Sequence, residues 1–176
     1  WEKAARPGGQ MPLAVAAPDK REVEPVWSYR WQEIQSLGVP VKTGVAPSAQ
    51  SIRAFAPDFV VVATGARPRP CPFDTSRLDA TIAVVHAWDI LAAPARIPPG
   101  ARATIIGGGM VGMETADLLS LHGVSCTVVE ALPAAAAGMA RNNRMELIER
   151  VEARGSRILT GVTVLNAEAS YLEVEG

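Results

Sequence analysis

The stretch ARATIIGGGMVGMETADLLSLHGVSCTVVE, residues 101–130, decides the fold because two short apolar runs enclose a glycine cluster and a helical pattern. The apolar, β-branched run 103–106 predicts a strand that leads directly into the glycines of 107–112. A helix is predicted from Met110 to His122, and a second strand over 126–129 ends at Glu130. Strand, turn, helix and strand in this order predict a βαβ unit with parallel strands.

Each glycine of this G-x-G-x-x-G pattern has a predicted role. Gly107 permits a tight turn, Gly109 lets a pyrophosphate approach the backbone, and Gly112 lets the helix lie close to the sheet. The helix would direct its unpaired N–H groups towards phosphates. Glu130 stands about 20 residues after the glycines, where a carboxylate can accept from both ribose hydroxyls of adenosine. The alternative is a glycine turn in an ordinary βαβ unit that binds nothing.

Composition excludes several other classes. The chain has 176 residues, of which 48% are apolar and 20% charged, as expected for a globular protein. A net charge of −1 predicts no binding to nucleic acid or membrane. The sequence lacks a long apolar run and a signal-peptide pattern, so a cytoplasmic location is expected. Cys71 and Cys126 are too far apart in the sequence for a C-x-x-C pair, and neither suggests a metal site.

The first half of the chain contains weaker patterns. Gly8-Gly9-Gln10 predicts either a sharp turn or close approach to a ligand. A helix is predicted from Pro25 to Gly38. Its expected buried face consists of Trp27, Trp31 and Ile34. The two tryptophans favour core packing over a ligand platform.

Further segments follow this helix. An edge strand is predicted over 39–45, and one helical turn over 51–55. The run 59–65 is continuously apolar before its final turn, which predicts a strand buried on both faces of a parallel sheet. Residues 66–100 are Pro-rich and predict a linker and a domain boundary, with a short helix near 88–91.

The end of the chain predicts one helix and two strands. After an Ala-rich loop over 131–140, Asn142 or Asn143 would cap a helix that ends near Ala153. Strands are predicted over 158–164 and 171–174. The expected inward residues of the helix are Met145, Ile148 and Val151, and the expected solvated ones are Arg144, Glu146, Glu149, Arg150 and Glu152. His86 and His122 are interpreted as surface or capping residues.

The sequence contains an internal repeat. LGVPVKTGV at 37–45 matches RGSRILTGV at 154–162, and each follows a helix that itself follows an acid, Glu2 or Glu130. If the halves are duplicated, Glu2 corresponds to Glu130, and the matching glycine loop would precede Trp1. We therefore expect a fragment whose first nucleotide-binding unit lacks its opening strand, glycine loop and helix.

These residues carry a family resemblance. Gly8-Gly9-Gln10, Ala63-Thr64-Gly65, the stretch 107–114 and Glu130 together resemble the two-dinucleotide-domain fold of flavoprotein disulfide reductases. More narrowly, the chain resembles the C-terminal module of the 2,4-dienoyl-CoA reductase, trimethylamine dehydrogenase and NADH:flavin oxidoreductase family. The resemblance implies an α/β fold with Rossmann-like parallel sheets. Residues 1–96 would form a partial FAD-binding domain with its linker, and residues 97–176 an NAD(P)-binding domain that is incomplete at its C-terminal end.

The resemblance also implies site residues. Glu2 would hold the FAD ribose, and Glu114 would face the nicotinamide. Gly9 and Gln10 would lie along FAD, and Thr64 and Gly65 would approach its phosphates. The residues implied for the NAD(P)H pyrophosphate are Gly107, Gly108, Gly109, Met110 and Val111, with Glu130 at the ribose. The alternative for Glu114 is a solvated helix carboxylate.

The implied activity is passage of hydride from NADH or NADPH to FAD, and then electron transfer through a 4Fe-4S cluster to FMN in an N-terminal barrel outside this chain. Disulfide reduction is not expected without a redox cysteine pair. Glu130 favours NADH because it would repel a 2′-phosphate, and Arg141 is the single basic residue that would favour NADPH instead. No side chain is an evident acid, base or nucleophile. A short-chain dehydrogenase is disfavoured because no Tyr-x-x-x-Lys pair follows the glycine loop. The expected partners are the nicotinamide and flavin nucleotides and the FMN barrel, and a homo-oligomer is one further option. The alternative function is a non-catalytic, structural ADP-binding domain.

Overall fold

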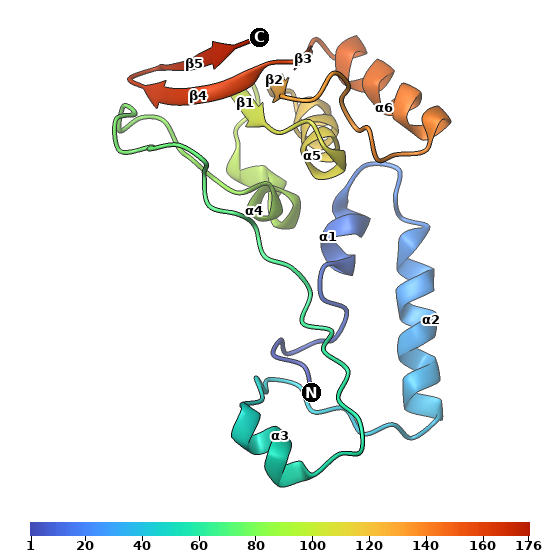
Figure 1. Ribbon diagram of the computed structural model, residues 1–176. Coiled ribbons are helices and arrows are strands. Elements are labelled where there is room, and N and C mark those ends of the chain that lie inside the picture. Colours follow the sequence, from blue (N-terminus) through green and yellow to red (C-terminus); the bar gives the residue numbers. More distant parts are fainter. The chain divides into compact units, whose positions relative to one another are not determined.

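The computed structural model describes residues 1–176, apart from the side chain of Ala95, and divides the chain into two compact units (Figure 1). Unit 1 comprises residues 1–67 and unit 2 residues 68–176. The helices of unit 1 are α1 (Met11–Ala16), α2 (Val23–Ser36) and α3 (Ala49–Phe55). The helices of unit 2 are α4 (Ala87–Ala92), the 3₁₀ turn Pro94–Arg96, α5 (Met110–Leu121) and α6 (Arg141–Ala153). Its strands are β1 (Arg102–Ile106), β2 (Ser125–Glu130), β3 (Arg157–Thr160), β4 (Thr163–Glu168) and β5 (Tyr171–Glu175).

A parallel sheet organises unit 2. Its order is β1-β2-β3, with Ile106 opposite Val129 and Glu130 opposite Thr160. Parallel neighbours require crossover connections, which α5 and α6 provide. The predicted α/β fold with parallel strands is therefore confirmed, and β4 and β5 add an antiparallel hairpin.

Helix α5 packs as its sequence predicts. Gly112 is buried, Ala116 is fully buried and Leu119 is 2% exposed. The helix ends at Leu121, and Gly123, two residues later, adopts a φ of 76° that permits the chain reversal. The N–H of Val124 then donates to the Leu119 carbonyl at 3.0 Å. The core around α5 also contains Ile90, Met113, Cys126, Val128, Ala135, Ala136, Leu147 and Val151.

Two details of unit 2 differ from prediction. Helix α6 begins at Arg141 with Ala140 as its N-cap, so the predicted cap at Asn142 or Asn143 is wrong. Leu147 is buried in place of Met145, which is 49% exposed. The predicted strand over 158–164 is two strands, because Gly161 adopts a φ of 71° between β3 and β4. The strand expected at 171–174 is confirmed as β5.

Part of the predicted linker packs into unit 2. The short helix expected near 88–91 is α4, and its Ile90 is 3% exposed. Residues 77–79 also bind the β4–β5 turn: the N–H of Asp79 donates to the Ala169 carbonyl at 3.0 Å, and the N–H of Ala169 donates to the Arg77 carbonyl at 2.9 Å. The assignment of residues 1–96 and 97–176 to two cofactor domains stays a prediction.

Unit 1 contains three helices whose packing is looser than predicted. Helix α1 was not predicted, and α2 has no buried residue, so its tryptophan face is half-buried instead of buried. Trp27 lies against Gly8, because a Cβ added at Gly8 would lie 2.4 Å from the indole Nε1. The turn expected at 51–55 belongs to α3, which Ser48 caps by accepting from the N–H of Ser51.

The predicted strand at 59–65 is wrong. The segment is extended without a strand ladder, and Phe59 and Val61 are 90% and 88% exposed. An apolar run forms a buried strand only where a neighbouring backbone pairs with it, and no described segment of unit 1 does so along these residues. Residues 39–45 also form no regular strand, although the N–H of Glu2 donates to the Lys42 carbonyl at 2.8 Å.

The internal repeat is confirmed by backbone hydrogen bonds. In unit 1 the N–H of Val45 donates to the Glu2 carbonyl at 2.9 Å. In unit 2 the N–H of Val162 donates to the Glu130 carbonyl at 3.0 Å. Gly44 and Gly161, at matching positions, both adopt a φ of 71°. Glu2 and Glu130 are therefore structurally equivalent residues of two copies of one local motif.

Among the residues described, none of the helices combines the length and the apolar character that a bilayer crossing requires.

Candidate nucleotide-binding site

The glycine loop connects β1 to α5 through a sharp turn. Gly107 adopts a φ of 96°, which favours glycine, and its N–H donates to the Val129 carbonyl at 2.8 Å. Gly109 is the N-cap of α5, with extended backbone angles. The loop therefore ends where the first N–H groups of α5 have no partner within the helix.

Gly112 and Gly109 face different surroundings. A Cβ added at Gly112 would lie 1.9 Å from the carbonyl oxygen of Gly107, so the loop and helix can meet only with glycine there. A Cβ added at Gly109 would meet no protein atom within 4 Å. Gly109 therefore borders open space beside the helix N-terminus, as the predicted approach of a pyrophosphate requires. Met110 and Val111, in the first turn, are 48% and 43% exposed.

The Glu130 carboxylate lies at the end of β2 and faces the glycine loop. It is 9% exposed. Its Oε2 accepts from the N–H of Gly108 at 2.7 Å, and its Oε1 accepts from the N–H of Leu132 at 2.7 Å. Each carboxylate oxygen can accept more than one hydrogen bond, so neither is saturated by these contacts.

The glycine loop, the helix N-terminus and the acid thus meet at the carboxyl ends of β1 and β2. In open parallel sheets, ligands bind at this edge. An open glycine backbone, unpaired N–H groups and a nearby carboxylate fit the pyrophosphate and ribose of a dinucleotide. Residues 107–111 and Glu130 are the residues that could hold it.

Glu114 is buried, which contradicts the alternative of a solvated carboxylate. It lies on α5 one turn after Met110 and is 8% exposed. Its expected orientation towards a nicotinamide stays a prediction.

The residues expected to bind FAD lie in unit 1. Oε1 of Glu2 accepts from the N–H of Ala4 at 2.8 Å, the same bond to the second following residue that Glu130 makes with Leu132. A Cβ added at Gly65 would lie 3.8 Å from Nε2 of Gln10, so these two predicted residues are neighbours. Gly9 is open, with no protein atom within 4 Å of an added Cβ. Thr64 is exposed.

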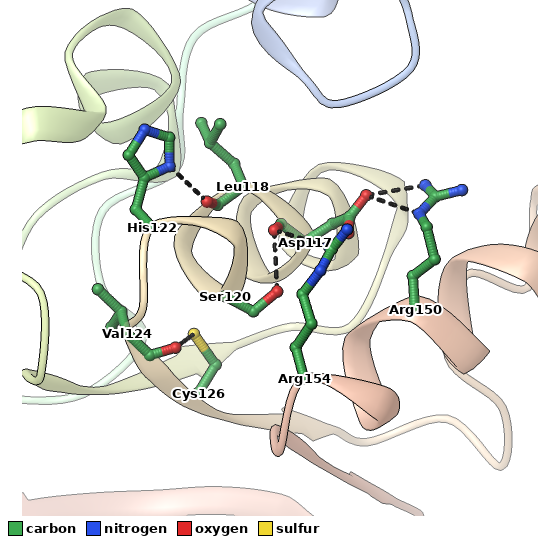
Figure 2. Close-up of polar contacts among 8 residues, drawn as sticks. All are labelled: Asp117, Leu118, Ser120, His122, Val124, Cys126, Arg150 and Arg154. Carbon is green, nitrogen blue, oxygen red and sulfur yellow. Dashed lines mark hydrogen bonds and ion pairs between the residues drawn. The ribbon is translucent and has the colours of Figure 1, made fainter.

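A buried ion-pair cluster was missed in the sequence (Figure 2). The side chain of Asp117 on α5 is 1% exposed, and its Oδ2 accepts from Nη2 of Arg150 on α6 at 2.8 Å. Nη1 of Arg154 pairs with Oδ1 of the same carboxylate. Arg150 is therefore not a solvated residue as predicted. The signal was the spacing of four residues between Arg150, in the last turn of α6, and Arg154, its C-cap, which places both side chains on the same side.

The other polar groups of this region are local. His122 hydrogen-bonds through Nδ1 to the Leu118 carbonyl at 2.8 Å, which confirms its capping role (Figure 2). Cys126 is 1% exposed, and burial raises the pKa of its thiol above the usual value. Within the described part of the chain, no group of three or more His, Cys, Asp or Glu could hold a metal ion.

Comparison with known proteins gives the family. The model of the pyridine nucleotide-disulphide oxidoreductase family matches residues 26–175. The chain belongs to this family. An NADH oxidase of Thermoanaerobacter brockii is 34% identical over 166 residues, which are 93% of this chain and 25% of that protein. A bilirubin reductase of Mediterraneibacter gnavus is 34% identical over 99% of this chain and 26% of its own length. The chain thus spans about a quarter of the length of each of these two relatives.

Solved structures share the fold across both units. A 2-naphthoyl-CoA reductase superposes with a TM-score of 0.82 at 24% identity, over 98% of this chain and 26% of that one. Histamine dehydrogenase from Rhizobium sp. 4-9 superposes with a TM-score of 0.79 at 18% identity, over 98% of this chain and 28% of that one. The resemblance to the nucleotide-binding module of large flavoprotein oxidoreductases is confirmed.

Proposed function

We propose that this chain is the nucleotide-binding module of a larger flavin-dependent oxidoreductase and that it binds NAD(P)H in unit 2 and FAD in unit 1. The observation that carries the proposal is the glycine loop of unit 2, where open Gly109 and the N-terminus of α5 adjoin the Glu130 carboxylate. The family and the names of the relatives agree with this function.

Residues 107–111 would bind the pyrophosphate. Glycine at 109 leaves room for a close approach, and the dipole and unpaired N–H groups of α5 stabilise negative charge there. The Glu130 carboxylate would accept from ribose hydroxyls with its remaining lone pairs. Its charge would repel a 2′-phosphate, so NADH would bind more tightly than NADPH.

The FAD site is proposed on the repeat. Glu2 occupies the position of Glu130 and makes the equivalent hydrogen bond, so it would accept from the FAD ribose. Gly9, Gln10, Thr64 and Gly65 would line the flavin nucleotide, and the proximity of Gln10 to Gly65 supports one common surface.

The contribution of the chain itself is binding and orientation. When bound, the nicotinamide and flavin supply the hydride and electron chemistry. No described residue is assigned a role as acid, base or nucleophile. Glu114, buried near the start of α5, would lie towards the nicotinamide end of the site.

The rest of the reaction would lie outside this chain. We propose that an FMN domain with a 4Fe-4S cluster passes the electrons to the final substrate. The cytoplasmic location, the domain limits at 96/97 and a homo-oligomer stay predictions.

The experiment that tests this function is anaerobic reduction of the bound flavin by NADH in the complete oxidoreductase, followed by absorbance. Gly109→Val is the test variant, and Gly138→Val is the control because an added Cβ at Gly138 also meets no atom within 4 Å. We expect rapid reduction that only Gly109→Val abolishes. Tight ADP binding without any flavin reduction would instead indicate a structural nucleotide-binding domain.

A further inference from the structure

Both hydrogen-bonding groups of the Gly108 backbone are engaged, one by the last residue of β2 and the other by the loop that follows it. The N–H of Gly108 donates to Oε2 of Glu130 at 2.7 Å. The carbonyl of Gly108 accepts from the N–H of Ala136 at 2.7 Å. The middle residue of the glycine loop is therefore held by two hydrogen bonds from residues 130–136, at the end of β2 and in the loop that follows it.

This contact is close and buried. A Cβ added at Gly108 would lie 2.9 Å from Cβ of Glu130 and 3.2 Å from Cγ1 of Val128, so the residue at 108 must be glycine for the segment to approach. Ala136 is fully buried and adopts a φ of 49°, a left-handed conformation that is unfavourable for alanine. Such a conformation persists when its surroundings determine it, as the bond to Gly108 and the core packing do here.

We propose that Glu130 is a positioning residue for the glycine loop, in addition to its proposed contact with the ribose. With Ala136 it fixes Gly108, and Gly108 in turn sets the path of the backbone from Gly107 to Gly109, where the pyrophosphate would bind. The inference rests on the proposed function, since that function supplies the ligand. It predicts that removing the carboxylate weakens even a ligand that has no ribose hydroxyl to contact.

The decisive probe is 2′,3′-dideoxy-ADP, which keeps the adenine and pyrophosphate but lacks both ribose hydroxyls. Its affinity and that of NADH are measured by titration calorimetry on the 176-residue chain. In Glu130→Ala the buried N–H of Gly108 loses its acceptor, so the affinity for dideoxy-ADP should fall about tenfold or more. Glu146→Ala, on the exposed surface of α6, is the control and should change neither affinity.

The second readout is hydrogen exchange of the Gly108 amide in the nucleotide-free chain. Glu130→Ala should accelerate this exchange by at least about tenfold, because the hydrogen bond is lost. Glu130→Gln retains one acceptor oxygen in place of two, so both of its effects should lie between those of wild type and Glu130→Ala. Glu130→Gln also replaces Glu130→Ala as the test variant if Glu130→Ala does not fold.

The outcomes separate this inference from the proposed function. If Glu130→Ala weakens NADH but leaves dideoxy-ADP binding unchanged, Glu130 is only a ribose contact and the inference is overturned, whatever the exchange rate. If the wild type binds neither nucleotide, the proposed function fails. The exchange rate of Gly108 then decides alone: acceleration in the variants supports the positioning role, and an unchanged rate overturns it.

Discussion

Gly112 lies so close to Gly107 that a Cβ on Gly112 would stand 1.9 Å from the Gly107 carbonyl oxygen. The last glycine of the loop therefore serves the fold itself, since helix α5 could not otherwise follow β1 so closely. Gly109, with no protein atom near an added Cβ, serves no such packing purpose. The two glycines of one motif thus have separable roles.

Substitution of Gly112 by alanine should destabilise the chain. The added methyl group would force α5 away from the loop, and overpacking of this kind costs about 1–3 kcal/mol. Urea unfolding followed by circular dichroism measures the effect. Gly138→Ala is the matched control, because an added Cβ there meets nothing within 4 Å, and it should change the free energy of unfolding by less than about 0.5 kcal/mol. Equal effects of both substitutions would contradict the close packing.

The Asp117 cluster should respond non-additively to mutation. Arg150→Ala and Arg154→Ala each leave one arginine beside the buried carboxylate, but the double variant leaves Asp117 without either cation. An uncompensated buried charge is strongly destabilising. The double variant should therefore lose more unfolding free energy than the sum of the single variants, by about 1–2 kcal/mol in a double-mutant cycle. Strict additivity would show that the two arginines act independently.

The two cysteines should differ in reactivity. Cys126 is 1% exposed and burial raises its pKa, so at neutral pH the reactive thiolate is both scarce and shielded. Cys71 is half-buried. A thiol reagent at pH 8 should modify Cys71 first in the native chain, and Cys126 only after denaturation. Rapid modification of Cys126 in a Cys71→Ser variant under native conditions would contradict its buried position.

The nucleotide-binding half was predictable because its signals are local. The glycines of 107–112, the small face of α5 and the acid at 130 all lie within one continuous stretch, and the structure forms a strand, helix and strand from them. The equivalence of Glu2 and Glu130 was likewise predictable from matched residues around Gly44 and Gly161. Such patterns reflect local backbone conformation, which a short stretch of sequence largely determines.

Long-range contacts could not be predicted in this way. Arg150 has the pattern of a solvated helix residue, and only the packing of α6 on α5 brings it to Asp117. The apolar run from Phe59 predicts a buried strand, but burial requires a pairing neighbour that no described segment of unit 1 provides. The hydrogen bond from Ala136 to Gly108 requires a left-handed conformation at Ala136, which the sequence of the Ala-rich loop does not indicate.

The most direct test of the glycine loop as the nucleotide site is calorimetric titration of the chain with NADH, comparing wild type with Gly109→Ala. We expect the wild type to bind NADH and Gly109→Ala to bind it at least about tenfold more weakly, because the added Cβ occupies the approach of the pyrophosphate. The unfolding free energy of the variant should stay within about 0.5 kcal/mol of wild type. Equal NADH affinity in the two proteins, or no binding by a folded wild type, would contradict the assignment of the glycine loop as the nucleotide site.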